Sequence, residues 1–79
     1  MSRRYVVIFD RELARSAPRF GFHLRIESPY LNGFELIGTV ELPDCSTMPA
    51  ARAKARELGY EPTHHATIDN GGAFTPMRY

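Results

Sequence analysis

Three histidines and one cysteine are the side chains best suited to metal or nucleophilic chemistry in this 79-residue chain. His64 and His65 are adjacent, Asp69 follows them, and His23 lies far earlier in the sequence. Neighbouring residues of a strand point to opposite faces, so His64 and His65 would not share one ion. Cys45 lies in a different predicted element, whereas a zinc site needs converging ligands. The pattern predicts no metal site and no cofactor.

The acidic residues and the glycines offer no clear catalytic arrangement. Glu27, Glu35 and Glu41 are predicted on one exposed face of a hairpin, and paired carboxylates need a cleft in which their surroundings differ. Cys45 is expected to be a small inert residue near a helix start. The Asn70–Gly72 segment precedes a strand and lacks the Lys and hydroxyl residues of a phosphate loop. These features predict a protein that is not an enzyme.

Arg52, Lys54 and Arg56 form the densest basic cluster, on a predicted helix. Arg52 and Arg56 are four residues apart, where like charges repel slightly. The cluster is either a solvated helix face or a contact for phosphate groups. The net charge of +1 and the mostly inward aromatic residues do not favour nucleic acid.

Length and composition predict one small domain spanning residues 1–79. A single cysteine excludes an intrachain disulfide, which fits a reducing cytosol. No stretch approaches the roughly 20 apolar residues of a membrane span, and the apolar run after Arg4 is too short for a signal peptide. We expect a soluble, cytoplasmic protein.

Hydrophobic periodicity predicts three strands in the first half of the chain, at Arg4–Asp10, Phe20–Ser28 and Phe34–Leu42. A polar connection over Arg11–Arg19 separates the first two. The turn-forming residues Pro29–Gly33 join the last two into an antiparallel hairpin.

The second half predicts one helix followed by two strands. Ser46 or Thr47 can cap the helix and Gly59 ends it. Strands follow at His64–Asp69 and Ala73–Tyr79. The predicted fold class is α+β: an antiparallel β-sheet with one α-helix packed on one face, in the order β-β-β-α-β-β.

Alternation in the central hairpin assigns each residue to one face of the sheet. Leu24 and Leu36 are predicted inward, each costing about 2–4 kcal/mol when replaced by Ala. To avoid a Glu27–Glu35 pair, we expect Arg25 opposite Glu35, with Phe22 across from Gly38. The outward residues form the predicted partner-binding patch: His23, Arg25, Glu27, Glu35, Ile37, Thr39 and Glu41. Such a patch is either a wet sheet face or a protein interface, including that of a homodimer.

The capped, Ala-rich helix of Ser46–Tyr60 ends in Leu-Gly-Tyr before a short His-containing strand. In this segment, in size and in its single helix on an antiparallel sheet, the chain resembles the small anti-CRISPR proteins of bacteriophages. The resemblance implies a non-catalytic, protein-binding inhibitor that blocks a bacterial CRISPR-Cas defence complex. The alternative is a small nucleic-acid-binding accessory domain that uses the basic helix face.

Overall fold

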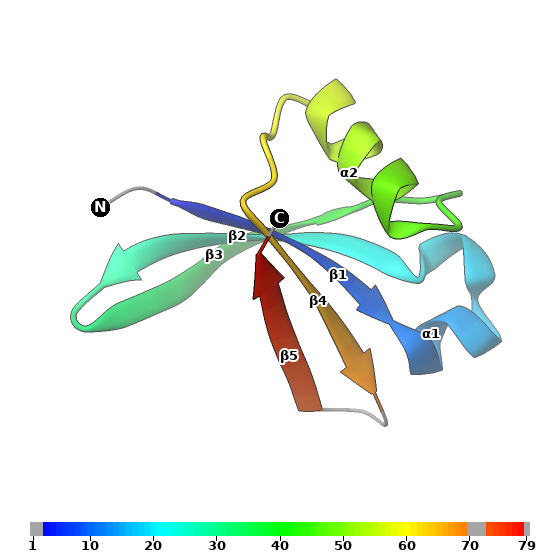
Figure 1. Cartoon of the computed structure of the whole chain (residues 1–79), viewed down its shortest axis with the longest axis horizontal. Coiled ribbons are helices and arrows are strands. Elements are labelled where there is room, and N and C mark those ends of the chain that lie inside the picture. The colour runs from blue at the N-terminus through cyan, green and yellow to red at the C-terminus, as the bar shows by residue number, and fades with distance from the viewer. Residues whose placement is uncertain (1–2, 70–72, 79) are drawn as a thin grey trace.

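The computed structural model describes residues 3–69 and 73–78 (Figure 1). The predicted α+β class is confirmed, whereas the chain order differs from the predicted β-β-β-α-β-β by a short helix between the first two strands. The predicted Asn70–Gly72 turn lies outside the described residues. The strands and helices, in chain order, are β1 (Arg4–Asp10), α1 (Arg11–Ser16), a 3-10 turn (Pro18–Phe20), β2 (Phe22–Tyr30), β3 (Gly33–Glu41), α2 (Met48–Glu57), β4 (His64–Asp69) and β5 (Ala73–Arg78).

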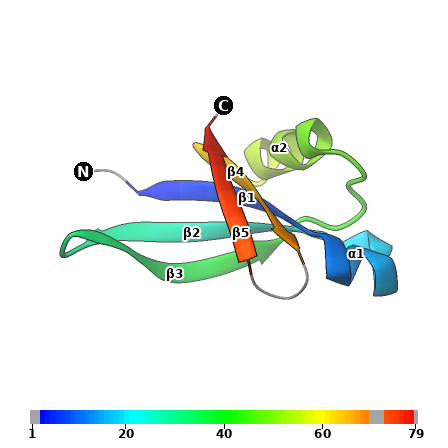
Figure 2. The same cartoon turned by 60° about the horizontal axis from the view of Figure 1, so that its bottom comes forward.

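The five strands form one twisted sheet in the order β3-β2-β1-β4-β5 (Figures 1 and 2). Three of the pairings are antiparallel, but β1 and β4 run parallel. That pairing differs from the fully antiparallel sheet predicted. The helix α2 explains it, because a helical crossover from β3 returns the chain in the same direction as β3 and β1.

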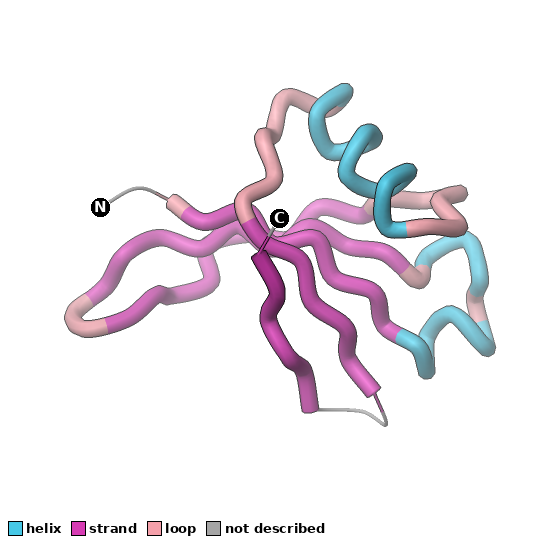
Figure 3. Tube along the Cα trace, in the orientation of Figure 1, coloured by secondary structure: helices cyan, strands magenta, loops and turns pink. Residues whose placement is uncertain are grey.

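The predicted polar connection after β1 is a short helix, α1 (Figure 3). The Asp10 carboxylate accepts a hydrogen bond from the Leu13 N–H at 3.0 Å and caps the first turn. This helix packs so closely on Gly21 that a Cβ there would lie 2.8 Å from the Ala14 Cβ. The following 3-10 turn includes Phe20, so β2 begins at Phe22 and not at Phe20.

The main core lies between α2 and the sheet, as predicted. Its fully or almost fully buried members are Val7, Phe22, Leu24, Leu42, Ala51 and Ala55. The Thr47 hydroxyl caps α2 by accepting from the Ala50 N–H, and Gly59 ends the helical segment at a φ of 96°. Because alanines line its inner side, the helix can approach the sheet closely.

The register of the β2–β3 hairpin differs from the prediction. Arg25 lies opposite Thr39, Glu35 lies opposite Ser28, and Ile26 rather than Phe22 faces Gly38. The turn has only two central residues, between Tyr30 and Gly33, instead of the predicted five-residue connection.

A β-bulge shifts the register between Ile26 and Glu27, leaving Ile37 as the extra residue of β3. The bulge keeps Val40 and Gly38 on the α2 side, opposite Leu24 and Ile26. Beyond it, every side chain of β3 changes face relative to the predicted alternation. The predicted arrangement of the exposed face is therefore wrong in this half of the hairpin.

Candidate protein-binding surface

The sheet face directed away from α2, which we call the outer face, carries most of the polar groups predicted to meet a partner. Strand register assigns its members. They are Arg4, Val6 and Ile8 on β1, His23, Arg25 and Glu27 on β2, Phe34, Leu36, Thr39 and Glu41 on β3, and His64, Ala66 and Ile68 on β4.

A second apolar cluster lies on the outer face, on β1 and β4. Val6, Ile8 and Ala66 are buried in it, and Ile68 packs against them. Above this cluster the face is hollowed by about 270 Å³. The residues around the hollow are Ile8, Asp10, His23, Arg25, Leu36, Thr39 and Ile68. Its lining combines three apolar side chains with a carboxylate, an imidazole, a guanidinium and a hydroxyl, so it can offer both apolar contact and hydrogen bonds.

Glu27 is the buried charged residue of this face, with 6% of its surface exposed. Its carboxylate accepts from Arg4 Nε at 2.6 Å and lies 3.3 Å from Arg25 Nη2. The Arg4 guanidinium also stacks over the Phe34 ring, 4.0 Å from its centroid. One carboxylate thus joins β1 to β2 and orients a cation against β3. Burial of an unpaired carboxylate would be costly, so the two arginines are needed to keep it there.

The hairpin end, residues 28–37, extends past the point where β1 stops pairing with β2 at Arg4 and Glu27 (Figure 1). Among the described residues, large exposed hydrophobic side chains gather here. They are Tyr30 (55% exposed), Leu31 (83%), Phe34 (37%), Leu36 (50%) and Ile37 (46%). Elsewhere in the part of the chain with described side chains, Leu58 at the C-cap of α2 is also exposed.

Leu31 has a further peculiarity at the tip of the hairpin. Its φ is 52°, in the left-handed region that glycine adopts readily and leucine rarely. A leucine there costs about 1–2 kcal/mol relative to an unstrained residue. The side chain is also almost fully solvated, so it returns no burial energy to the fold. The fold alone therefore does not account for leucine at this position.

The structure brings together only part of the predicted patch. His23, Arg25, Glu27, Thr39 and Glu41 share the outer face, as expected. Glu35 lies on the other side of the hairpin, and Ile37 occupies the bulge. Leu36, predicted inward, lies on the outer face instead, together with Phe34. The alternation of apolar and polar residues gave no signal of the bulge. The turn-forming residues between Tyr30 and Gly33 were nevertheless compatible with a two-residue turn.

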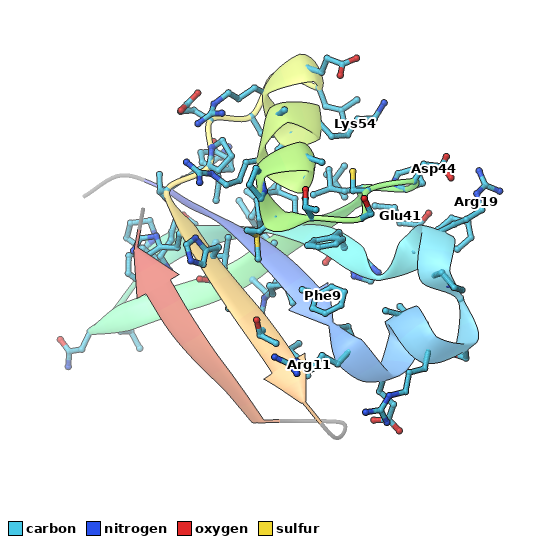
Figure 4. The ribbon with its side chains drawn as sticks, turned by 45° about the vertical axis from the view of Figure 1, so that its right-hand side comes forward. Phe9, Arg11, Arg19, Glu41, Asp44 and Lys54 are labelled. Carbon is cyan, nitrogen blue, oxygen red and sulfur yellow. The ribbon has the colours of Figure 1, made fainter. Side chains whose placement is uncertain are left out.

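The three basic residues of α2 do not form one open stripe. Arg56 Nε lies 3.3 Å from the Glu61 carboxylate. Arg52 is half-buried near His65, and burial together with this positive charge lowers the pKa of that histidine. Lys54 projects from another side of the helix (Figure 4). The phosphate-binding surface predicted from these residues is therefore split between different surroundings.

The cysteine and histidines also occupy separate places. Burial raises the pKa of the Cys45 thiol, which disfavours the nucleophilic thiolate. His64 lies on the outer face, whereas His65 lies toward α2, as their adjacency in a strand predicts. Within residues 3–68, whose side chains are described, no three His, Cys, Asp or Glu side chains converge as metal ligands. The side chain of Asp69 lies outside the described residues.

A second hollow, of about 390 Å³, lies on the α2 side near Phe9 and Phe22. Figure 4 shows Phe9 in the interior of this side and the Arg19–Asp44 pair at its rim. Arg19 Nε donates to Asp44 at 2.7 Å, and this hydrogen bond lowers the pKa of the Asp44 carboxyl. The walls are mostly apolar and offer one thiol and one hydroxyl, of Cys45 and Ser46.

In the part of the chain that the structure describes, no helix is long and apolar enough to cross a membrane. Comparison of the chain with protein families, curated proteins and solved structures gave no match. The candidate surface is consequently assigned from its geometry.

Proposed function

We propose that this chain is a non-catalytic protein-binding module whose contact surface is the hairpin end together with the adjoining outer face. The observation that carries the proposal is the concentration of exposed apolar side chains on residues 30–37. Large exposed apolar side chains gathered on one part of a small protein are typical of protein interaction sites. The strained and exposed Leu31 supports the proposal, because a partner pocket would give its side chain the burial that the fold does not.

The outer face supplies the polar part of this surface. Arg4 and Arg25 surround Glu27, and His23 and Thr39 line the neighbouring hollow. An apolar anchor next to fixed charges is the usual composition of an interface, in which burial gives affinity and charges select the partner.

Site-specific photo-crosslinking tests the proposal. A photo-reactive amino acid at position 31 should give a discrete adduct with a host protein. The same group at Ala53, an exposed position of α2, should not. Excess unlabelled wild-type protein should compete for the adduct, and a Leu31→Gly protein should compete poorly. Equal adducts from both positions, or equal competition by both proteins, would refute the proposed surface.

A more specific form of the proposal follows from the resemblance to phage inhibitors. In this form, the partner is a subunit of a bacterial CRISPR-Cas complex. Binding would then block the complex by covering a site for nucleic acid or for another subunit. A phage plating assay on a host with active CRISPR-Cas tests this form. Wild-type protein should restore plaques, Ala53→Ser should act like wild type, and Leu31→Gly should not restore them. Failure of the wild type against the defence types tested would exclude those targets and leave the crosslinking result unaffected.

Nucleic-acid binding through Arg52, Lys54 and Arg56 is the competing outcome. It predicts binding to labelled duplex DNA or RNA that weakens steeply with salt. It also predicts that binding is lost in an Arg52→Glu, Arg56→Glu protein and retained in Leu31→Gly. That combination would replace the protein-binding proposal.

A further inference from the structure

The long side of β3 that faces away from β2 is an open strand edge, because β3 is the terminal strand of the sheet. The Leu42 N–H donates to the Phe22 carbonyl at 3.1 Å, which places this pair in hydrogen-bonded register. Backbone groups alternate along an antiparallel ladder, so Val40 and Gly38 also bond toward β2. Thr39 and Glu41 therefore direct their N–H and C=O groups to the open edge.

The charges on this strand have one sign. Gly33–Glu41 contains Glu35 and Glu41, both exposed, and no Lys or Arg. The nearest cations on the same face, Arg4 and Arg25, are drawn to the Glu27 carboxylate at 2.6 and 3.3 Å. Figure 4 shows Glu41 at the end of β3, before the loop that carries Asp44.

Between the two glutamates the strand exposes apolar side chains. Leu36 is 50% and Ile37 46% exposed. Edge strands are commonly protected by a lysine, a proline or a bulge. Here the described strand has the bulge at Ile37, and on its C-terminal side the edge of Gly38–Glu41 continues without interruption.

We propose that this edge receives an extended segment of the partner as an added strand alongside Gly38–Glu41. Backbone hydrogen bonds to Thr39 and Glu41 would hold the segment, a basic side chain would meet Glu41, and apolar side chains would cover Leu36 and Ile37. The inference rests on the proposed protein-binding function and specifies its partner. A second copy of this chain fits less well, because pairing β3 with β3 gathers only glutamates along the new junction.

Two synthetic eight-residue peptides serve as probes: one alternates Val with Arg, and its matched control alternates Val with Glu. Amide NMR spectra of the full chain should show the Val-Arg peptide shifting the signals of Thr39 and Glu41. Glu41→Gln should weaken this peptide by about fivefold or more, the scale expected for losing one charged contact. Glu57→Gln, the same charge change on exposed α2, should leave its affinity as in the wild type.

Thr39→Pro tests the backbone contact. Proline fits an edge strand when its missing N–H faces away from the neighbouring strand, so β3 should keep its pairing with β2 while the added strand loses a hydrogen bond. Peptide binding should disappear, and the amide spectrum should show that the fold persists. A hairpin that unfolds in this variant contradicts the assigned direction of the Thr39 N–H and overturns the proposal.

Other outcomes also decide the inference. Equal binding of the Val-Glu peptide, or shifts confined to residues 30–36, would overturn the edge contact. So would a concentration-dependent dimer that Thr39→Pro abolishes, because a second copy would then occupy the edge. If neither peptide binds while the position-31 adduct forms, the added strand is wrong and the protein-binding function stands.

Discussion

The covered part of β2 and the hairpin end of β3 place their leucines in opposite surroundings. On the α2 side, Leu24 is completely buried beneath the alanines of the helix. On β3, beyond the bulge, Leu36 is half exposed although the same alternation predicted it inward. Burial here depends on whether a helix or a neighbouring strand lies over the position. One region therefore supplies stability, and the other keeps apolar surface free for contact.

The largest expected difference between these regions is in stability. Leu24→Ala should lower the free energy of unfolding by about 2–4 kcal/mol, because it leaves a cavity in closed packing. Leu36→Ala should cost less than about 1 kcal/mol, since its side chain is already half solvated. Urea melts of both variants measure the contrast. Equal losses would mean that the hairpin end is as tightly packed as the core.

Glu27→Ala probes the charged part of the outer face. The change leaves Arg4 and Arg25 without their shared carboxylate and should cost about 1–3 kcal/mol, limited because both arginines remain partly solvated. Glu41→Ala, on the same face but exposed, is the matched control and should have little effect in the same melts. A Glu27→Ala protein as stable as the control would show that the ion pairs of Glu27 do not stabilise the fold.

Leu31→Gly should change stability in the opposite direction. Glycine adopts a φ of 52° without steric cost, so the hairpin gains about 0.5–1 kcal/mol after the larger entropy of glycine in the unfolded chain is counted. Thermal melts measure the gain, and the crosslinking competition measures the expected loss of binding. A destabilised Leu31→Gly protein would mean that the leucine supports the fold itself.

The smallest expected effect is a pH dependence of stability caused by His65 on the α2 side. Burial and the charge of Arg52 lower the pKa of His65 below its ordinary 6.5. The unfolded chain therefore binds a proton more readily, and stability falls as the pH drops below about 6.5 toward the folded pKa. His65→Gln should reduce this fall, measured by urea melts between pH 7.5 and 5. Identical slopes in both proteins would contradict the assignment.

Local patterns sufficed for the elements that depend on neighbours in sequence. The alternation of Phe22, Leu24 and Ile26 predicted a strand, and Thr47 and Gly59 predicted both ends of α2. The helix α1 was missed because its six residues carry no apolar stripe, and only Asp10 signals its start.

Features that depend on distant pairing could not be predicted in the same way. Nothing in β1 or β4 alone specifies that they run parallel. The two-residue turn fixes one register, and the buried positions near Val40 require a register shifted by one residue. The extra residue Ile37 connects the two registers, so the bulge depends on the whole hairpin. It also decides that Phe34 and Leu36, and not Glu35, belong to the candidate surface. Five of the seven predicted patch residues consequently share a face, while its main apolar members were not foreseen.

The parallel pairing of β1 with β4 has a consequence for how the chain is synthesised. The Thr63 N–H donates to the Tyr5 carbonyl at 2.9 Å, and these residues are 58 positions apart. While the ribosome is still producing the middle of the chain, one side of β1 has no strand to bond with. In the nascent β1–β2–β3 meander, Leu24 also stays uncovered until α2 has been synthesised. The complete sheet therefore forms only after β4 has left the ribosome. Until then the unpaired edge of β1 is exposed to chaperones and to aggregation.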